Sequence, residues 1–296
     1  QSRGASEREC SRMSDRPPLG VDALAAETEL VTVVIPCYNH REFVGAAIES
    51  ALRQTYPAIQ LIVIDDGSTD GSPAFLESLA TQHGFDLLAQ SNTGVCRALN
   101  RAIRERARGR FIALLGSDDI WALDKVALQI ARLRAEPGAE FCYAQAQMFQ
   151  RTPADAHGAP FPARPVEGSV IGRVVCRQHV PAGTMLFTRA LYDSLGGFDE
   201  QLKEEDWDFV IRAAVRTRFV AVRRALLFYR AHATNAMRVR PRREIFHQKI
   251  LVLAKNFPVL PAGRWICAVV VHFTHDVLLG SALRAFRRYR PIDVNQ

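Results

Sequence analysis

In the first half of the chain, short apolar runs alternate with segments whose apolar residues recur at the spacing of a helix. Four apolar runs predict strands: residues 30–36, 61–66, 86–90 and 110–116. A helix is expected after each of them, and the first one, beginning near Val44, repeats its apolar residues at i, i+4, i+7 and i+8. Strands that are apolar on both faces and separated by helices predict an α/β fold, with a parallel sheet covered on both sides.

Polar residues directly follow three of these four predicted strands. The three loops read "PCYN" (36–39), "DDGS" (65–68) and "GSDD" (116–119). The carboxyl ends of parallel strands meet at one edge of a sheet, and ligands of α/β proteins bind outside that edge. We therefore expect the three loops to converge on one rim, where Asp118 and Asp119 follow a strand and are not buried in it.

The second half of the chain is less regular. Residues 151–168 are rich in Pro, Ala and Gly, which predicts a long loop of the kind that forms lids or linkers. Residues 203–214 ("KEEDWDFVIRAA") indicate a helix with an acidic start, and residues 219–232 indicate a hairpin. Two further helical segments are expected, at roughly 241–256 and 262–288.

These elements predict three parts of the chain. Residues 1–29 are polar, lack the apolar core of a secretory signal and are expected to be disordered. Residues 30–238 are expected to form the main domain. Residues 239–296 are expected to form a helical and basic extension.

The composition is that of a globular protein, with 48% hydrophobic and 23% charged residues. The six cysteines are scattered without a C-x-x-C pair, which favours a reducing compartment over a disulfide framework or a zinc knuckle. The net charge of +7 is concentrated in arginines after residue 238. Such a tail is typical of contact with nucleic acid, anionic lipid or a phosphorylated ligand, or of a solvated charged face.

Asp118 and Asp119 are candidate ligands of a divalent cation. Paired carboxylates with few other protein ligands suit Mg²⁺ or Mn²⁺ that is bound together with substrate phosphates. The alternative is that one of them caps the following helix and the other is solvated. Their position at a strand end, opposite two other polar strand ends, favours the metal site.

Three other polar positions are candidates for binding or catalysis. Asp65 and Asp66 can accept a hydrogen bond from a base N–H, although Asp-Gly-Ser is also a common turn. Asp206 shares a helix face with Phe209, so it is expected on the packed side, where a carboxylate can act as a general base. Acids also stabilise a helix start, which is the alternative for Asp206. His232 is a candidate metal ligand or phosphate contact, or a surface histidine.

Motifs of other nucleotide-binding and hydrolytic enzymes are absent from the sequence. It contains no G-x-x-x-x-G-K-[ST], no G-x-G-x-x-G after the first strand and no G-x-S-x-G. NTPases with a P-loop, dinucleotide-dependent dehydrogenases and α/β-hydrolases are therefore disfavoured.

Several ordered segments together resemble the family-2 glycosyltransferases, which have the GT-A fold. The resemblance runs over roughly residues 31–235. It rests on the following segments: "VTVVIPCYNHREFVGAAIESALRQTYP", "LIVIDDGSTDGS", "NTGVCRALNRAI", "GSDD", "GGFDEQLKEEDWDF" and "YRAHATN". It implies a Rossmann-like, mostly parallel central sheet flanked by helices, with a nucleotide-binding half at 30–120 and an acceptor half at 121–238.

The resemblance also implies roles for particular residues. Asp206 would deprotonate the acceptor hydroxyl, with Glu205 beside it, and Asp119, Asp118 and His232 would hold Mn²⁺ or Mg²⁺. Gly116 departs from the family pattern, since many members have an aspartate there. The residues that would bind the nucleotide-sugar are Pro36, Tyr38, Asn39, Asp65, Asp66, Gly67, Asn92, Gly94, Asn100 and Asp118.

The function expected from the resemblance is metal-dependent transfer of a sugar, with inversion, from a nucleotide-diphospho-sugar such as a UDP-sugar to a hydroxyl acceptor. The acceptor would be a carbohydrate or a lipid-linked saccharide in surface polysaccharide or glycolipid synthesis. The alternative is a nucleotidyltransferase on a similar fold. No nucleic-acid partner is expected.

The expected location is cytoplasmic, with peripheral contact at the inner face of the membrane as one option. Residues 265–290 are apolar and then basic, but His272, His275 and Asp276 interrupt the apolar run, so it falls short of the ~18 residues of a membrane span. These helices are expected to lie on an anionic membrane, on the catalytic domain or on a second subunit.

Overall fold

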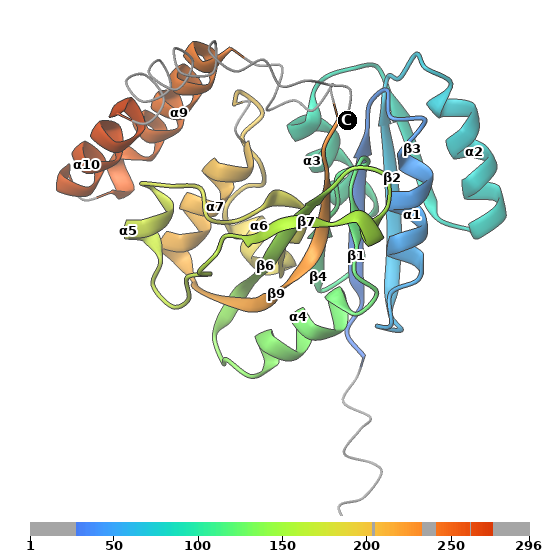
Figure 1. The fold of residues 1–296 in the computed structure, drawn as a ribbon, viewed down its shortest axis with the longest axis horizontal. Coiled ribbons are helices and arrows are strands. Elements are labelled where there is room, and N and C mark those ends of the chain that lie inside the picture. Colours follow the sequence, from blue (N-terminus) through green and yellow to red (C-terminus); the bar gives the residue numbers. More distant parts are fainter. Residues whose placement is uncertain (1–27, 203–204, 233–240, 261, 275–296) are drawn as a thin grey trace, which may run out of the picture.

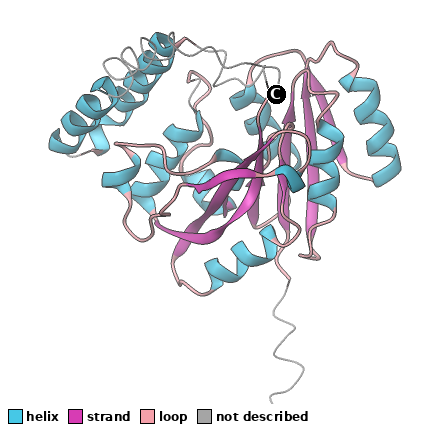
Figure 2. Ribbon diagram, in the orientation of Figure 1, coloured by secondary structure: helices cyan, strands magenta, loops and turns pink. Residues whose placement is uncertain are grey.

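The computed structural model describes residues 28–202, 205–232, 241–260 and 262–274. One twisted sheet runs through the main domain, with helices on both of its faces (Figures 1 and 2). The strand order is β3-β2-β1-β4-β8-β6-β9-β5, and β7 pairs with β6 outside this path. The expected α/β architecture is therefore confirmed.

The first half of the sheet is wholly parallel, as its sequence pattern predicted. It consists of β1 (Val31–Cys37), β2 (Ile59–Asp66), β3 (Asp86–Gln90) and β4 (Phe111–Leu114). The connecting helices are α1 (Val44–Leu52), α2 (Ser72–His83) and α3 (Val95–Arg106). All four strand ends therefore point to the same rim.

Alternate residues of these strands enter two separate apolar cores, one on each face of the sheet. Val33 and Val63 join the core under α1 and α4, whereas Val34 and Ile62 join the core under α3 and α7. Side chains of successive strand residues point to opposite faces, so a strand buried on both sides must be apolar at every position. This explains the unbroken apolar runs of the sequence.

The second half of the sheet mixes directions. Its strands are β5 (Ile120–Trp121), β6 (Ala139–Phe149), β7 (His157–Phe161), β8 (Leu186–Thr188) and β9 (Arg218–Arg230). β6 and β9 run parallel, whereas β8, β7 and β5 are antiparallel to their neighbours. Its helices are α4 (Lys125–Arg134), α5 (Ile171–Val174), α6 (Arg189–Ser194) and α7 (Glu205–Arg216).

The hairpin expected at 219–232 is wrong, because Arg218–Arg230 forms one long strand. Within this strand, Arg223 and Arg224 lie where the register between β6 and β9 shifts by extra residues. A bulge of this kind accommodates residues that do not pair with the neighbouring strand. The two arginines form ion pairs with Glu167 and Asp124.

The loop expected at 151–168 is only partly a loop. Residues 157–161 form β7, which pairs with β6. The side chains of Gln145 and Gln147 on β6 donate hydrogen bonds to the carbonyls of Pro162 and Gly158. This side-chain pairing attaches a segment that has little strand propensity of its own.

Two C-terminal helices pack against the outside of the main domain, at the upper left of Figure 1. They are α9 (Arg242–Asn256) and α10 (Ala262–His272). Asn256 donates to the buried carboxylate of Asp208 on α7, and a ring nitrogen of His272 lies 3.1 Å from the Val175 carbonyl oxygen. Residues 275–288 of the expected second helix lie outside the described residues, as does the segment 1–27. Within the described residues, no helix is long and apolar enough to cross a membrane.

Candidate active site

The three polar loops converge on one rim and are hydrogen-bonded to one another. Asn39 adopts a positive φ of 54°, which is tolerated by asparagine better than by most residues. Its backbone N–H donates to the Ser68 hydroxyl, and its side-chain oxygen accepts from the Thr69 N–H. His40 Nδ1 lies 2.8 Å from the Ser117 hydroxyl. The convergence expected from strand polarity is therefore confirmed.

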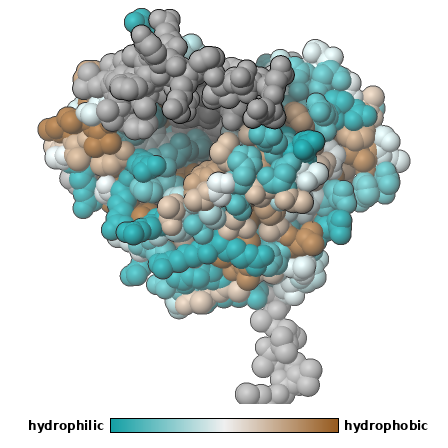
Figure 3. Space-filling view, in the orientation of Figure 1, coloured by the Kyte–Doolittle hydropathy of each residue, from teal (hydrophilic) through white to brown (hydrophobic). Residues whose placement is uncertain are grey.

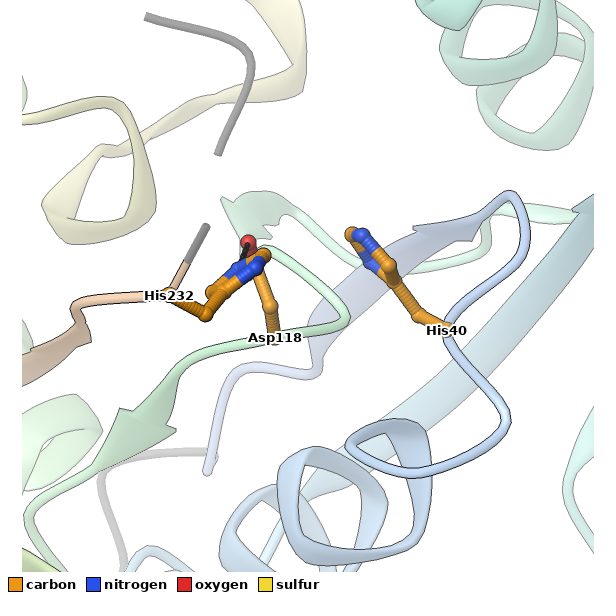
Figure 4. A group of neighbouring side chains, drawn as sticks. All are labelled: His40, Asp118 and His232. Carbon is orange, nitrogen blue, oxygen red and sulfur yellow. Dashed lines mark hydrogen bonds and ion pairs between the residues drawn. The ribbon is translucent and has the colours of Figure 1, made fainter. Parts of the chain in front are cut away.

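Two histidines and an aspartate lie together at this rim (Figure 4). They come from the ends of three strands: His40 follows β1, Asp118 follows β4 and His232 follows β9. His232 Nε2 lies 3.0 Å from Asp118 Oδ2, and one ligand atom from each residue lies within 4.8 Å of the others. The Phe43 ring, 4.8 Å from the His232 ring, packs against this group.

Asp119 lies next to this group but is almost fully buried, with 5% of its surface exposed. One of its oxygens accepts a hydrogen bond from the Arg230 backbone N–H at 2.9 Å. Burial, together with the neighbouring Asp118 carboxylate, raises the pKa of Asp119 well above its ordinary value. The Arg230 side chain donates to the Asp118 carbonyl and stacks on the rings of Phe43 and Phe149. Arg230 thereby fixes the turn that carries both acids.

Gly116, where the family pattern often has an aspartate, leaves space for these two carboxylates. A Cβ atom at this position would lie 2.9 Å from Asp118 Oδ1 and 3.2 Å from Asp119 Oδ2. The present positions of Asp118 and Asp119 therefore depend on a residue without a side chain at 116.

The "DDGS" aspartates differ in what they bind. Both oxygens of Asp66 accept hydrogen bonds from the loop after β3, namely from the N–H groups of Thr93 and Gly94 and from the Gln90 amide. Asp65 accepts from the Ser68 N–H through one oxygen, and its other oxygen is buried with no partner among the described residues. Asp66 therefore shapes the loop, whereas Asp65 retains one unused acceptor.

Asp206 opens onto a cavity of about 820 Å³ that Asp119 also lines. The helix spacing predicted that Asp206 would lie on the packed side of its helix with Phe209; Phe209 is fully buried, and Asp206 is half-buried and lines the cavity. Asp206 accepts a hydrogen bond from the Gln178 amide. Of Glu205 only the backbone is described, so the expectation for its side chain lies outside the described residues.

The remaining expected nucleotide-binding positions divide into rim and core. Pro36, Tyr38, Asn92 and Gly94 lie at the rim, with 47% of Tyr38 exposed. A Cβ atom on Gly67, whose φ is +77°, would come within 2.6 Å of the Asn92 nitrogen, so the two loops touch only because residue 67 is glycine.

Asn100 does not face the rim. It is 1% exposed, and its amide binds Phe198, Glu200 and Tyr192. We therefore leave Asn100 out of the proposed donor site.

Three residues of the site were not identified from the sequence. His40 follows "PCYN" directly and had a local signal, since it lies at a strand end like the other candidates. Gln178 and Arg230 had no local sequence signal, because their contacts join segments that are remote in the chain.

The strand order, the polar rim and the carboxylates after β4 define a GT-A-type glycosyltransferase fold. The structure is similar to that of Staphylococcus aureus TarS 1-349 in complex with UDP-GlcNAc, with a TM-score of 0.67 and 17% identity over 86% of this chain and 76% of that one. It is also similar to the mannosyltransferase PcManGT from Pyrobaculum calidifontis in complex with GDP-Man and Mn²⁺, with a TM-score of 0.61, 20% identity and coverage of 89% and 76%.

The sequence model of "Glycosyl transferase family 2" matches residues 32–169 of this chain, which supports the resemblance found in the sequence. It is 36% identical over 108 residues to the Escherichia coli UDP-Glc:alpha-D-GlcNAc-diphosphoundecaprenol beta-1,3-glucosyltransferase WfaP, covering 36% of this chain and 43% of that one. The matched part thus spans about two-fifths of that relative's length.

Proposed function

We propose that the protein transfers a sugar, with inversion, from a UDP-sugar to a hydroxyl acceptor in surface polysaccharide or glycolipid synthesis. The observation that carries the proposal is the cavity shared by Asp119 and Asp206, because it brings the donor rim and a candidate base to one space. The E. coli relative is named as a UDP-glucose-dependent enzyme, and the S. aureus structure contains UDP-GlcNAc, which supports a UDP-sugar donor.

The side chains at the rim fit a divalent cation. Two imidazoles and a carboxylate suit Mn²⁺ better than Mg²⁺, which prefers oxygen ligands alone. Ligands at right angles, about 2.1 Å from a six-coordinate ion, are about 3.0 Å apart, and His232 Nε2 and Asp118 Oδ2 have a separation of 3.0 Å. We therefore propose His40, Asp118 and His232 as ligands, with Asp119 beside them. When bound, the ion would neutralise charge on the diphosphate.

The residues of the chain then have separate tasks. Asp206 accepts the proton of the acceptor hydroxyl, whose oxygen forms a bond to the anomeric carbon on the face opposite the departing UDP. The bond between that carbon and the UDP oxygen breaks, and UDP leaves with the electron pair. Gln178 holds one Asp206 oxygen and orients the carboxylate toward the cavity. The expected participation of Glu205 stays a prediction.

For the nucleotide, the contacts favour Asp65 over Asp66 as the acceptor of the base N–H, because only Asp65 has an oxygen without a partner among the described residues. Asp66 holds the loop with Asn92 and Gly94, which together with Asn39, Gly67, Pro36 and Tyr38 would surround the nucleoside. Asp118 remains the proposed contact to ribose or sugar in addition to its metal role.

We further propose peripheral contact with the cytoplasmic face of a membrane through α10. Ile266, Val270 and Phe273 form an exposed apolar stripe at i, i+4 and i+7. Figure 3 shows apolar surface at the left edge of the molecule, where α10 lies. An apolar stripe on a basic helical extension is typical of binding to anionic lipid.

Asp206→Asn tests the reaction. We expect transfer to fall by at least about 10³-fold, because the amide cannot accept the proton, whereas UDP binding with Mn²⁺, measured by calorimetry, should be unchanged. Full transfer activity of Asp206→Asn would exclude Asp206 as the base. Pyrophosphate release from an NTP in place of UDP release would instead favour the nucleotidyltransferase alternative.

A further inference from the structure

Helix α10 contacts the segment that begins with α5 (Figure 1). A Cβ atom on Gly172 would lie 3.6 Å from the guanidinium carbon of Arg264, so the two helices touch at this point. Near the other end of α10, a ring nitrogen of His272 lies 3.1 Å from the Val175 carbonyl oxygen. Cys267 lies on α10 between these two contacts, and its side chain is exposed.

This contact brings two thiols together. Cys176, which directly follows the α5 segment, is half-buried, and Cys267 is its neighbour on α10. Burial, the charge of Cys267 and a hydrogen bond between the two side chains raise the pKa of the Cys176 thiol. Both residues are free cysteines. The other cysteines among the described residues are buried: Cys37, Cys96 and Cys142. The pair is therefore the place where a dissolved oxidant can reach the thiols of the described chain.

The segment that follows Cys176 reaches the cavity of the candidate active site. It lines that cavity as far as Gly183. The amide of Gln178, two residues after Cys176, donates a hydrogen bond to the Asp206 carboxylate. Because so few backbone torsions separate Cys176 from Gln178, a covalent bond at Cys176 restricts the position of the Gln178 amide. The thiol pair is thus connected to the proposed base through a short piece of chain.

We propose that Cys176 and Cys267 form a site of reversible oxidation, at which a peroxide joins α10 to the segment that holds Asp206. The exposed Cys267 thiolate attacks one oxygen of the peroxide, the O–O bond breaks, and the sulfur becomes a sulfenic acid. The Cys176 sulfur then attacks the sulfur of this sulfenic acid. The S–O bond breaks, and the oxygen leaves as water with the thiol proton. Two thiols and one hydrogen peroxide give one disulfide and two water molecules.

The surroundings of the two thiols assign this order. A cysteine that senses an oxidant is exposed to solvent and has a second thiol beside it, which fits Cys267 as the first to react and Cys176 as the second. In a reducing compartment such disulfides are transient, and small thiols reverse them by exchange. The inference does not depend on the proposed sugar transfer, since the disulfide can be measured without any substrate.

The test maps the bond in the folded, full-length protein. Every sample carries Cys10→Ser, because Cys10 lies outside the described residues. The protein is treated with a small excess of hydrogen peroxide, digested without reduction and analysed by mass spectrometry. We expect the loss of two thiols per chain and one linked peptide pair, which contains Cys176 and Cys267, and dithiothreitol should restore both thiols. Amide hydrogen exchange in residues 176–183 should slow several-fold on oxidation.

Single variants test the order of reaction. In Cys176→Ser, the sulfenic acid of Cys267 has no second thiol to react with and should be trapped by dimedone, whereas Cys267→Ser should give no adduct at Cys176. Cys96→Ser is the matched control: it removes a buried thiol of α3 and should leave the disulfide unchanged.

Three results would overturn the proposal. The first is that both thiols survive peroxide treatment of the folded protein. The second is a disulfide that joins Cys267 to a second copy of the chain in place of Cys176. The third is unchanged hydrogen exchange in residues 176–183 after the disulfide has formed, since the bond would then not act on the segment that holds Asp206. A dimedone adduct on Cys176 and not on Cys267 would overturn the assigned order.

Discussion

Lys125 is a lysine in the apolar core under α4. Its ammonium group lies 3.8 Å from the centre of the Trp121 ring and has no hydrogen-bond partner among the described residues. Complete burial lowers the pKa of Lys125 to about 7, because the charged form loses its hydration. Contact with the ring face offsets only part of this loss. The folded chain thus holds a side chain that favours the neutral form.

We expect Lys125→Met to stabilise the protein by about 1–4 kcal/mol at pH 6, since it removes a buried charge at similar volume. Between the folded pKa near 7 and the ordinary value near 10.5, the unfolded chain binds one proton more than the folded chain. The free energy of unfolding of the unsubstituted protein therefore rises with pH between about 7 and 10.5. Below pH 7 it stays at its lower value, because the lysine is then charged in the folded state as well. Urea denaturation at pH 6, 8 and 10 measures both effects.

The gain from Lys125→Met should shrink from pH 6 to pH 10, because the folded lysine becomes neutral above its pKa of about 7 and the cost of folding it fades as the pH approaches 10.5. A gain that stays constant with pH would show that packing and not charge determines the effect. A loss of stability at pH 6 would contradict the prediction directly.

Among the contacts between elements, the Asn100 side chain joins α3 to the turn before α7 from a buried position. Asn100 donates to the Phe198 carbonyl and the Glu200 carboxylate, and it accepts from the Tyr192 hydroxyl and the Phe198 N–H. The turn "GGFDE" that these bonds hold precedes the segment that carries Asp206. Asn100 thus connects the nucleotide-binding half to the acceptor half from inside the core.

Asn100→Ala should lower the free energy of unfolding by about 2–4 kcal/mol, because it leaves buried groups of Phe198 and Tyr192 without partners. Chemical denaturation measures this loss. Asn92→Ala is the comparison: Asn92 is exposed at the rim, so its substitution should weaken UDP binding and leave stability within about 0.5 kcal/mol. If Asn100→Ala left stability unchanged and weakened UDP binding, Asn100 would have to be assigned to the donor site after all.

At the scale of the whole molecule, charge and apolar surface coincide on the C-terminal helices. Ile266 and Val270 are 57% and 56% exposed, whereas Ala268 and His272 on the opposite face of α10 are buried. The charged residues of α9 and α10 are mostly basic: Arg242, Arg243, Lys249, Lys255 and Arg264 against Glu244. One face of α10 therefore packs on the protein while the other presents apolar side chains on a basic surface.

The double variant Ile266→Ser/Val270→Ser should bind vesicles that contain phosphatidylglycerol several-fold more weakly than the unsubstituted protein, because each apolar side chain contributes about 1 kcal/mol or more at the interface. Co-sedimentation measures the bound fraction, with phosphatidylcholine vesicles as the uncharged control. Unchanged sedimentation of the double variant would exclude the stripe as the contact with lipid.

Much of the architecture follows from local pattern. The strands and helices up to residue 106 lie where apolar periodicity predicts them, because each depends on residues that are close in sequence. The meeting of "PCYN", "DDGS" and "GSDD" follows as well, since parallel strands have a common direction. The second half was predicted less well. β7 is held to β6 in part by the side chains of Gln145 and Gln147, and β9 continues through a bulge at Arg223 and Arg224 where a hairpin was expected.

By itself the sequence determined the fold class, the rim and the identity of its acids, because strand direction and burial are encoded in local periodicity. Only the tertiary structure decided which of these side chains are available to a ligand. It added His40 to Asp118 and His232, committed Asp66 to a loop and brought Asp206 to a cavity that Asp119 also lines. The reason is physical: a hydrogen bond or a shared cavity depends on distances between remote segments, and the sequence pattern contains no such distance.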